Sequence, residues 1–94
     1  MAHCPYDKLG DMEPAFTAIR ALDGLREPKP GIFYMKSDGF LHFHVDKEGR
    51  RWADVKTAPR GAWTTIPVSD RVTAAECRKF VRAVEKCHKA YKGG

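Results

Sequence analysis

Apolar and polar side chains alternate in Phe40-Leu41-His42-Phe43-His44-Val45-Asp46 and again in Arg50-Arg51-Trp52-Ala53-Asp54-Val55-Lys56. A period of two is typical of β-strands, because successive side chains of a strand point to opposite faces. Between the two runs, Lys47-Glu48-Gly49 suits a three-residue hairpin loop with glycine in the left-handed conformation. The two runs therefore predict an antiparallel hairpin with strands at 40–46 and 50–56.

The three-residue loop sets the register of this hairpin. His44 then lies opposite Trp52, and His42 lies opposite Asp54. The apolar residues of the two strands meet one another on the other face, so the register is self-consistent. One face therefore belongs to a core, and the other carries two imidazoles, an indole and a carboxylate.

The residues before this hairpin predict a further strand at 31–37, since they are rich in aromatic and β-branched side chains. Asp38-Gly39 is a favoured two-residue turn, because both residue types adopt positive φ. This turn brings Phe33 and Met35 to the face that carries the histidines. A three-residue turn would instead bring the alternate residues of the strand there, among them Tyr34.

A last strand is predicted at 63–68. Pro67 has no N–H to donate to a neighbouring strand, so this strand belongs at a sheet edge. We expect Trp63 to anchor the strand in the core. The segment Arg26-Glu27-Pro28-Lys29-Pro30 cannot continue a helix and is expected to be a linker.

Two helices are predicted at the ends of the chain. The first, at about 12–23, begins after Asp11, whose carboxylate can accept the free amide hydrogens of the first turn. The second, at about 74–92, begins with the capping-box pattern Thr73-Ala74-Ala75-Glu76. The order α-β-β-β-β-α predicts a single α+β domain over residues 1–94. Its four-stranded antiparallel meander sheet packs with the N- and C-terminal helices.

Length and composition exclude several classes of protein. The chain has 94 residues, 43% of them hydrophobic, and is too short for most cofactor-enzyme architectures. It has no apolar run of the roughly 20 residues that cross a bilayer, and its first residues lack the apolar core of a signal peptide. Its three cysteines include no Cys-x-x-Cys pair, which favours a reducing compartment. We expect a cytoplasmic protein, monomeric or dimeric, with no membrane partner.

The histidine-bearing face of the sheet is the candidate ligand site. Its predicted members are Phe33, Met35, His42, His44, Trp52 and Asp54. The leading hypothesis is a non-enzymatic binding or interaction module that uses this face for a small ligand or a protein. A structural hypothesis is that these side chains only form cross-strand pairs that stabilise the sheet.

Three further hypotheses concern the same histidines. His42 and His44 are neighbouring imidazoles that could bind a metal such as zinc, with Asp54 as a third ligand or as a hydrogen-bond acceptor behind them. Alternatively, Asp54 could orient His42 as an acid–base pair. A metal-dependent enzyme centred on His42 and His44 is a further alternative. The sequence suggests no other cofactor. His3-Cys4 and Cys87-His88 could join a zinc site only if the two ends of the chain meet.

Positive charge is concentrated near the C-terminus. Residues 73–92 hold six bases and two acids, which accounts for four of the five net positive charges of the chain. The basic side chains that could contact a polyanion are Arg78, Lys79, Arg82, Lys86 and Lys89. The alternative function is therefore weak DNA or RNA binding through this helix, which would be electrostatic and dependent on salt.

Several stretches resemble a group of small bacterial proteins that sometimes carry the label luciferase-like domain and have no established activity. The resemblance rests on Gly31-Ile32-Phe33-Tyr34, Phe40-Leu41-His42-Phe43-His44-Val45-Asp46 and Ala53-Asp54-Val55-Lys56. It covers the middle of the chain. It implies a bacterial, cytoplasmic protein and transfers no catalytic residue.

The element order is also similar to that of proteins of the YjbR/MmcQ type, which have a frataxin-like arrangement. Tyr34-Met35-Lys36, Val55-Lys56 and Trp63 occupy places similar to motifs that recur in those proteins. The loop between Lys56 and Trp63 is shorter here. Because DNA binding is suspected for that type on grounds of fold, the similarity implies DNA as a partner by analogy only.

Overall fold

The hairpin of β3 (Asp38–Val45) and β4 (Arg51–Lys56) has the predicted register. The computed structural model describes residues 4–93, and in it His42 pairs with Asp54 and His44 pairs with Trp52. Gly49 has a φ of 84° in the connecting loop, a conformation that glycine adopts without steric cost. The register follows from the alternation of side chains together with this glycine-containing loop.

The sheet contains five antiparallel strands in the order β1-β2-β3-β4-β5, so the prediction of four strands was wrong. The remaining strands are β1 (Leu25–Lys29), β2 (Ile32–Met35) and β5 (Trp63–Val68). The missed strand is β1, which was expected to be a linker because of its prolines. It lies at a sheet edge, where a proline need not donate a ladder hydrogen bond, and its pairing with β2 is irregular between Arg26 and Lys29.

The first hairpin turns two residues earlier than predicted. Met35 pairs with Asp38 and Tyr34 pairs with Gly39, so Lys36 and Ser37 form the turn in place of Asp38-Gly39. Lys36 has a φ of 58°, in the left-handed region that was expected for the aspartate and the glycine. Asp38 and Gly39 therefore lie in β3 in the folded chain, despite the local turn preference of the Asp-Gly pair.

Contacts of the Asp38 side chain explain this outcome. Its carboxylate accepts hydrogen bonds from Lys56 Nζ at 2.8 Å, Tyr91 Oη at 2.6 Å and the Arg60 amide at 3.0 Å. These donors, Lys56 first, hold the pKa of the Asp38 carboxyl well below its usual range. Burial and the bond to Asp38 raise the pKa of Tyr91 to about 12. Three donors from distant segments thus keep Asp38 within the strand.

A β-bulge in β3 sets the register that places two phenylalanines and one methionine in the core. The β2–β3 register shifts between the pairs Phe33–Leu41 and Tyr34–Gly39, which leaves Phe40 as the extra residue. Phe40 is fully buried, with its ring 5.6 Å from that of Tyr91. Phe33 and Met35 are also buried among core residues. Their predicted place beside the histidines was wrong, and Tyr34 shares that face, as the alternative register implied.

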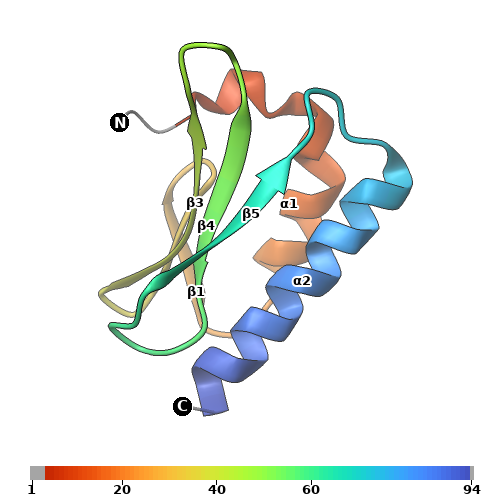
Figure 1. Cartoon of the computed structure of the whole chain (residues 1–94). Coiled ribbons are helices and arrows are strands. Elements are labelled where there is room, and N and C mark those ends of the chain that lie inside the picture. Colours follow the sequence, from red (N-terminus) through yellow and green to blue (C-terminus); the bar gives the residue numbers. More distant parts are fainter. Residues whose placement is uncertain (1–3, 94) are drawn as a thin grey trace.

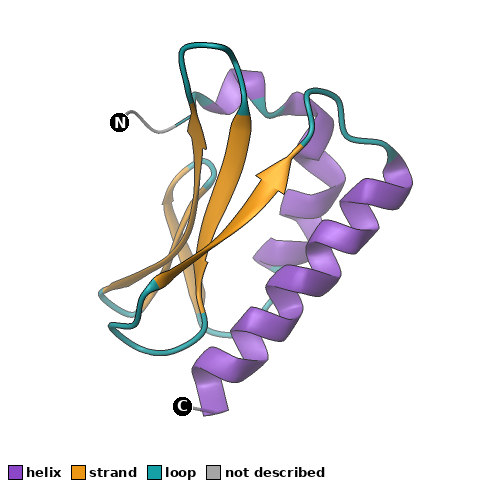
Figure 2. Ribbon diagram, viewed as in Figure 1, coloured by secondary structure: helices purple, strands orange, loops and turns teal. Residues whose placement is uncertain are grey.

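Both helices lie on the same side of the sheet (Figures 1 and 2). Helix α1 (Glu13–Arg20) follows the 3-10 turns η1 (Tyr6–Lys8) and η2 (Gly10–Met12) and is shorter than the predicted 12–23. Helix α2 (Ala74–Gly93) has the predicted capping box, in which the Glu76 amide donates to Thr73 Oγ1 at 3.1 Å and the Thr73 amide donates to Glu76 Oε1 at 2.9 Å. The predicted cap at Asp11 was wrong, because that carboxylate binds Arg51 instead.

The core fills the space between the helices and the sheet. Phe43 of β3 packs against Phe16 of α1 with ring centroids 5.3 Å apart and against Phe80 of α2 at 5.7 Å. Burial of each such side chain contributes about 1.5–3 kcal/mol before conformational entropy is subtracted. Neither α1 nor α2 covers the opposite face of the sheet (Figure 1). Within residues 4–93, no helix combines the length and the apolar character that crossing a bilayer requires.

Candidate functional site

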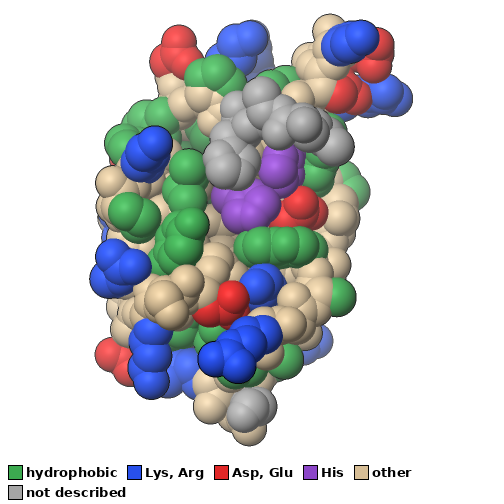
Figure 3. Space-filling view, turned by 90° about the vertical axis from the view of Figure 1, so that its left-hand side faces the viewer, with side chains coloured by type: hydrophobic (Ala, Val, Ile, Leu, Met, Phe, Trp, Pro, Cys, Tyr) green, Lys and Arg blue, Asp and Glu red, His purple; other side chains and the backbone are tan. Residues whose placement is uncertain are grey.

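Five side chains gather on the face of the sheet that points away from the helices. We call this surface the histidine face; it consists of His42 and His44 from β3, Trp52 and Asp54 from β4, and Trp63 from β5. Figure 3 shows the imidazoles next to an acidic side chain, with hydrophobic side chains nearby. Four of these five residues were predicted from the sequence, and strand pairing brings them together.

Three polar side chains converge at the centre of the histidine face. His42 Nδ1 lies 3.0 Å from His44 Nε2, and the same nitrogen of His44 lies 3.0 Å from Asp54 Oδ2. His44 is buried, whereas His42 and Asp54 are half-buried. The carboxylate thus contacts His44, although the acid–base hypothesis expected it to orient His42.

A hydroxyl on β5 holds the other oxygen of the carboxylate. Thr65 is the cross-strand partner of Asp54, and its Oγ1 donates to Asp54 Oδ1 at 2.9 Å. Since Oδ1 accepts this bond, Oδ2 is directed toward His44. Thr65 was not among the predicted site residues, because no register was predicted for the last strand.

The two tryptophans of the chain flank the imidazoles. The Trp52 ring stacks on His44 with centroids 5.4 Å apart, and the Trp63 ring contacts His42 at 4.3 Å in an edge-on arrangement. Trp63 is 40% exposed, so its predicted place in the core was wrong. Pairing with Lys56 puts Trp63 on the histidine face, where the Lys56 ammonium lies 4.7 Å from the indole centroid. The loop between β4 and β5 is too long to fix the register by counting, so the sequence analysis missed this position.

The cluster has the composition of a metal-binding site. One potential ligand atom from each of His42, His44 and Asp54 can be chosen so that the three atoms lie within 4.8 Å of one another. Imidazole nitrogen and carboxylate oxygen are common ligands of zinc. The arrangement can therefore bind a cation, or offer hydrogen bonds and ring surfaces to a small ligand.

Among the described residues, Cys4 and the pair Cys87-His88 do not come together as a second site. His3 lies outside the described residues. Cys4 is buried, and its amide donates to the Phe43 carbonyl at 2.9 Å. His88 Nε2 is hydrogen-bonded to the Asp23 carbonyl at 2.7 Å, and α2 ends at the opposite end of the molecule from the first described residues (Figure 1). Burial also raises the pKa of both the Cys4 and Cys87 thiols, which disfavours the thiolate.

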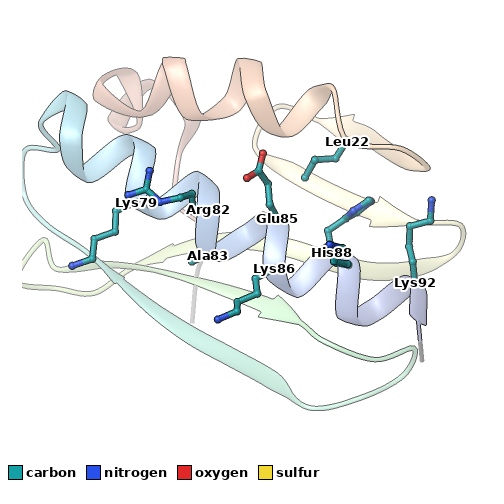
Figure 4. Close-up of a pocket in the computed structure, with 9 residues that line it drawn as sticks. Leu22, Lys79, Arg82, Ala83, Glu85, Lys86, His88 and Lys92 are labelled. Atoms are coloured by element: carbon teal, nitrogen blue, oxygen red, sulfur yellow. The ribbon is translucent and has the colours of Figure 1, made fainter.

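The predicted basic side chains lie along the outer side of α2. They are Arg78, Lys79, Arg82, Lys86 and Lys89, and all five are exposed. A shallow groove runs beside them, lined in part by Leu22 and His88 (Figure 4). Glu85 points to the same side as Leu22, whereas Lys86 points away from it (Figure 4). This surface and the histidine face are on opposite sides of the sheet.

Comparison with known proteins adds no relationship to these observations. The resemblances seen in the sequence therefore stay expectations, and function has to be inferred from the residues and their geometry. No protein-family model, curated protein or solved structure matches this chain.

Proposed function

We propose that the protein is a small non-enzymatic binding module whose ligand site is the histidine face. The observation that carries this proposal is the convergence of two imidazoles and a carboxylate, at distances of 3.0 Å, on a sheet face that α1 and α2 leave uncovered. Holding three polar side chains together restricts their rotamers, which costs conformational entropy. A ligand that binds all three would offset that cost.

The tryptophans support the same proposal. Among the described residues, Trp63 is the exposed large hydrophobic side chain, and it lies against His42. Binding sites are commonly built from aromatic surface with a few convergent polar groups, because the rings supply contact area and the polar groups supply orientation. The acid–base hypothesis receives less support, since the Asp54 carboxylate contacts the ring of His44, whereas that hypothesis pairs it with His42.

Tryptophan emission and amide chemical shifts test this proposal directly. Benzoate, inorganic phosphate and glucose serve as probes of aromatic, anionic and hydroxyl-rich ligands, together with the metal ions considered below. We expect at least one probe to shift the emission of Trp52 and Trp63 and the amides of β3 and β4. His42→Ala should abolish that response at little cost in stability, while Lys47→Ala in the exposed loop should leave it unchanged. A large stability loss in His42→Ala, with no response to any probe, would favour a purely structural role.

A second candidate function is polyanion binding through the basic side of α2. The observation that favours it is that none of the five exposed cations forms an ion pair with another residue in the range 4–93. At about 100° per residue, all five fall within an arc of about 100° on the helix. That arc is opposite the buried stripe around Phe80 and Val84. The positive charge therefore points straight into solvent, where a phosphate backbone could reach it.

Charge substitution and salt dependence test this second candidate. The variant Arg78→Gln, Arg82→Gln, Lys86→Gln should weaken binding of a short DNA duplex. It should also make the slope of log affinity against log salt concentration less negative. The slope should change by up to about 0.9 for each phosphate that the helix no longer neutralises. The control Lys29→Gln, Lys36→Gln, Lys47→Gln removes the same charge from other exposed positions. Equal effects of the two variants would show that only net charge matters.

A further inference from the structure

We infer that the ligand of the histidine face is a divalent first-row transition-metal ion, such as Zn²⁺, bound by His42, His44 and Asp54. This inference rests on the proposed function and names the chemical class of its ligand. It starts from the grouping of one potential ligand atom from each side chain within 4.8 Å of the other two. Such a grouping is compact enough for one ion to contact all three side chains.

The distances suit a single small ion. Ligand atoms at roughly 2.0–2.2 Å from a tetrahedral zinc ion lie about 3.3–3.6 Å from one another. The contacts from His44 Nε2 to His42 Nδ1 and to Asp54 Oδ2 both measure 3.0 Å. A contact between two ring nitrogens requires a hydrogen on one of them, and an ion can take the place of that hydrogen after small side-chain rotations. The same three atoms would then be its ligands.

The donor set selects the class of ion. Two imidazole nitrogens suit zinc and its neighbours in the first transition row, whereas Mg²⁺ and Ca²⁺ prefer sites made of oxygen. Three protein ligands also leave a coordination position for water or for an added ligand. We therefore expect tight binding of Zn²⁺ and no competition from Mg²⁺.

The surrounding structure preorganises the three side chains. His42 and Asp54 are direct cross-strand partners, so backbone pairing in the centre of the sheet fixes their separation. The hydroxyl of Thr65 orients the carboxylate, and Trp52 stacks on the ring of His44. The side chains therefore give up little further freedom when the ion binds, which favours affinity.

Isothermal calorimetry with Zn²⁺ at pH 7.5, followed in parallel by tryptophan emission, tests this inference. His42→Ala and Asp54→Asn should each weaken Zn²⁺ binding by at least about 10-fold. Even substitution of a residue that only hydrogen-bonds a metal ligand typically lowers metal affinity by that factor. Asp54→Asn keeps the size of the side chain and an oxygen that can accept from Thr65, so it tests the site even if His42→Ala folds poorly. Cys87→Ser is the control, because Cys87 is the least buried described cysteine, and its affinity should be unchanged.

The possible failures are distinguishable. Absence of Zn²⁺ binding at micromolar concentrations, or equal binding by wild type, His42→Ala and Asp54→Asn, would overturn the metal assignment. If benzoate, phosphate or glucose still perturbs Trp52 and Trp63, the histidine face remains a ligand site and only the metal is wrong. If neither Zn²⁺ nor any other probe perturbs them, the proposed function fails as well.

Discussion

A single hydroxyl determines which oxygen of Asp54 faces the imidazoles. Thr65 Oγ1 donates to Oδ1 at 2.9 Å, and Oδ2 is left 3.0 Å from His44 Nε2. Groups that hydrogen-bond a metal ligand from behind fix its orientation and tune its affinity. In the proposed metal site, Thr65 is therefore a positioning residue that does not itself contact the ion.

This role predicts a specific effect of Thr65→Val, which has nearly the same shape but no hydroxyl. We expect Zn²⁺ affinity to fall by about 10-fold, as is typical when a ligand is deprived of an outer hydrogen bond. Thr65→Ser should restore it, because the hydroxyl returns. Thr64→Val is the matched control, since the neighbouring exposed threonine pairs with Val55, on the other face of the sheet. Calorimetry on the four proteins decides the matter, and equal affinities for Thr65→Val and wild type would contradict the positioning role.

At the scale of elements, the sequence predicted those strands whose two faces differ most. In β3 and β4 apolar residues alternate on the core face, so a one-residue slip would turn the histidines toward the helices and Leu41 and Phe43 away from them. The strand β1 carries no such signal, because Pro28 and Pro30 dominate the composition of that segment. Its edge position, where few ladder hydrogen bonds are required, is a property of the whole sheet.

The first hairpin shows why part of the candidate site was misplaced. Asp38-Gly39 is a strong local turn signal, but Lys56, Arg60 and Tyr91 bind the Asp38 carboxylate and keep it in β3. Those donors come from residues at least 18 positions away, so no local pattern reveals them. The site residues on the central hairpin were predictable for the opposite reason, since their register depends on a short loop and on alternation.

The displaced turn leaves Lys36 in an unfavourable backbone conformation, which predicts a gain in stability. A non-glycine residue at positive φ costs about 1 kcal/mol, partly offset by the greater freedom that glycine has in the unfolded chain. We expect Lys36→Gly to stabilise the protein by about 0.5 kcal/mol. Ser37→Gly is the control and should destabilise it by a similar amount, because φ is not positive at Ser37. The free energy of unfolding in urea measures both changes, and a loss of stability in Lys36→Gly would show that its side chain matters more than its φ.

At the scale of the whole molecule, the two proposed surfaces are separated by the sheet and the core. Figure 1 shows α1 and α2 on one side of the sheet. The histidine face lies on the other side, and the basic side chains of α2 are exposed on the side of the helix opposite its buried residues. Substitutions far apart that share no partners have nearly additive effects. Asp54→Asn should therefore leave the salt dependence of DNA binding unchanged, and the charge variant of α2 should leave Zn²⁺ binding unchanged.

One buried ion pair joins three distant parts of the chain. Arg51 of β4 is only 8% exposed, and its guanidinium donates to both carboxylate oxygens of Asp11 at 2.8 and 2.9 Å. The same group donates to the carbonyls of Lys8 and Ser69, and the Val72 amide donates to Asp11 Oδ2 at 2.8 Å. The N-terminal turns, the sheet and the segment before α2 are thereby held together. Hydrogen bonds from Arg51 lower the pKa of Asp11 to about 2.

This lowered pKa predicts how acid destabilises the molecule. The folded protein binds a proton at Asp11 less readily than the unfolded chain, in which the pKa has the ordinary value of about 3.9. The stabilising contribution is therefore complete above about pH 5 and is lost as the pH falls through 2, with a size of about 2 kcal/mol. Asp11→Asn should destabilise the protein by about that amount at pH 7, and the difference from wild type should disappear only below about pH 2. Asp7→Asn, at an exposed position in the same segment, is the control and should change stability little. Urea unfolding at several pH values gives the comparison, and a difference for Asp11→Asn that stays constant with pH would mean that the pair contributes through packing instead of charge.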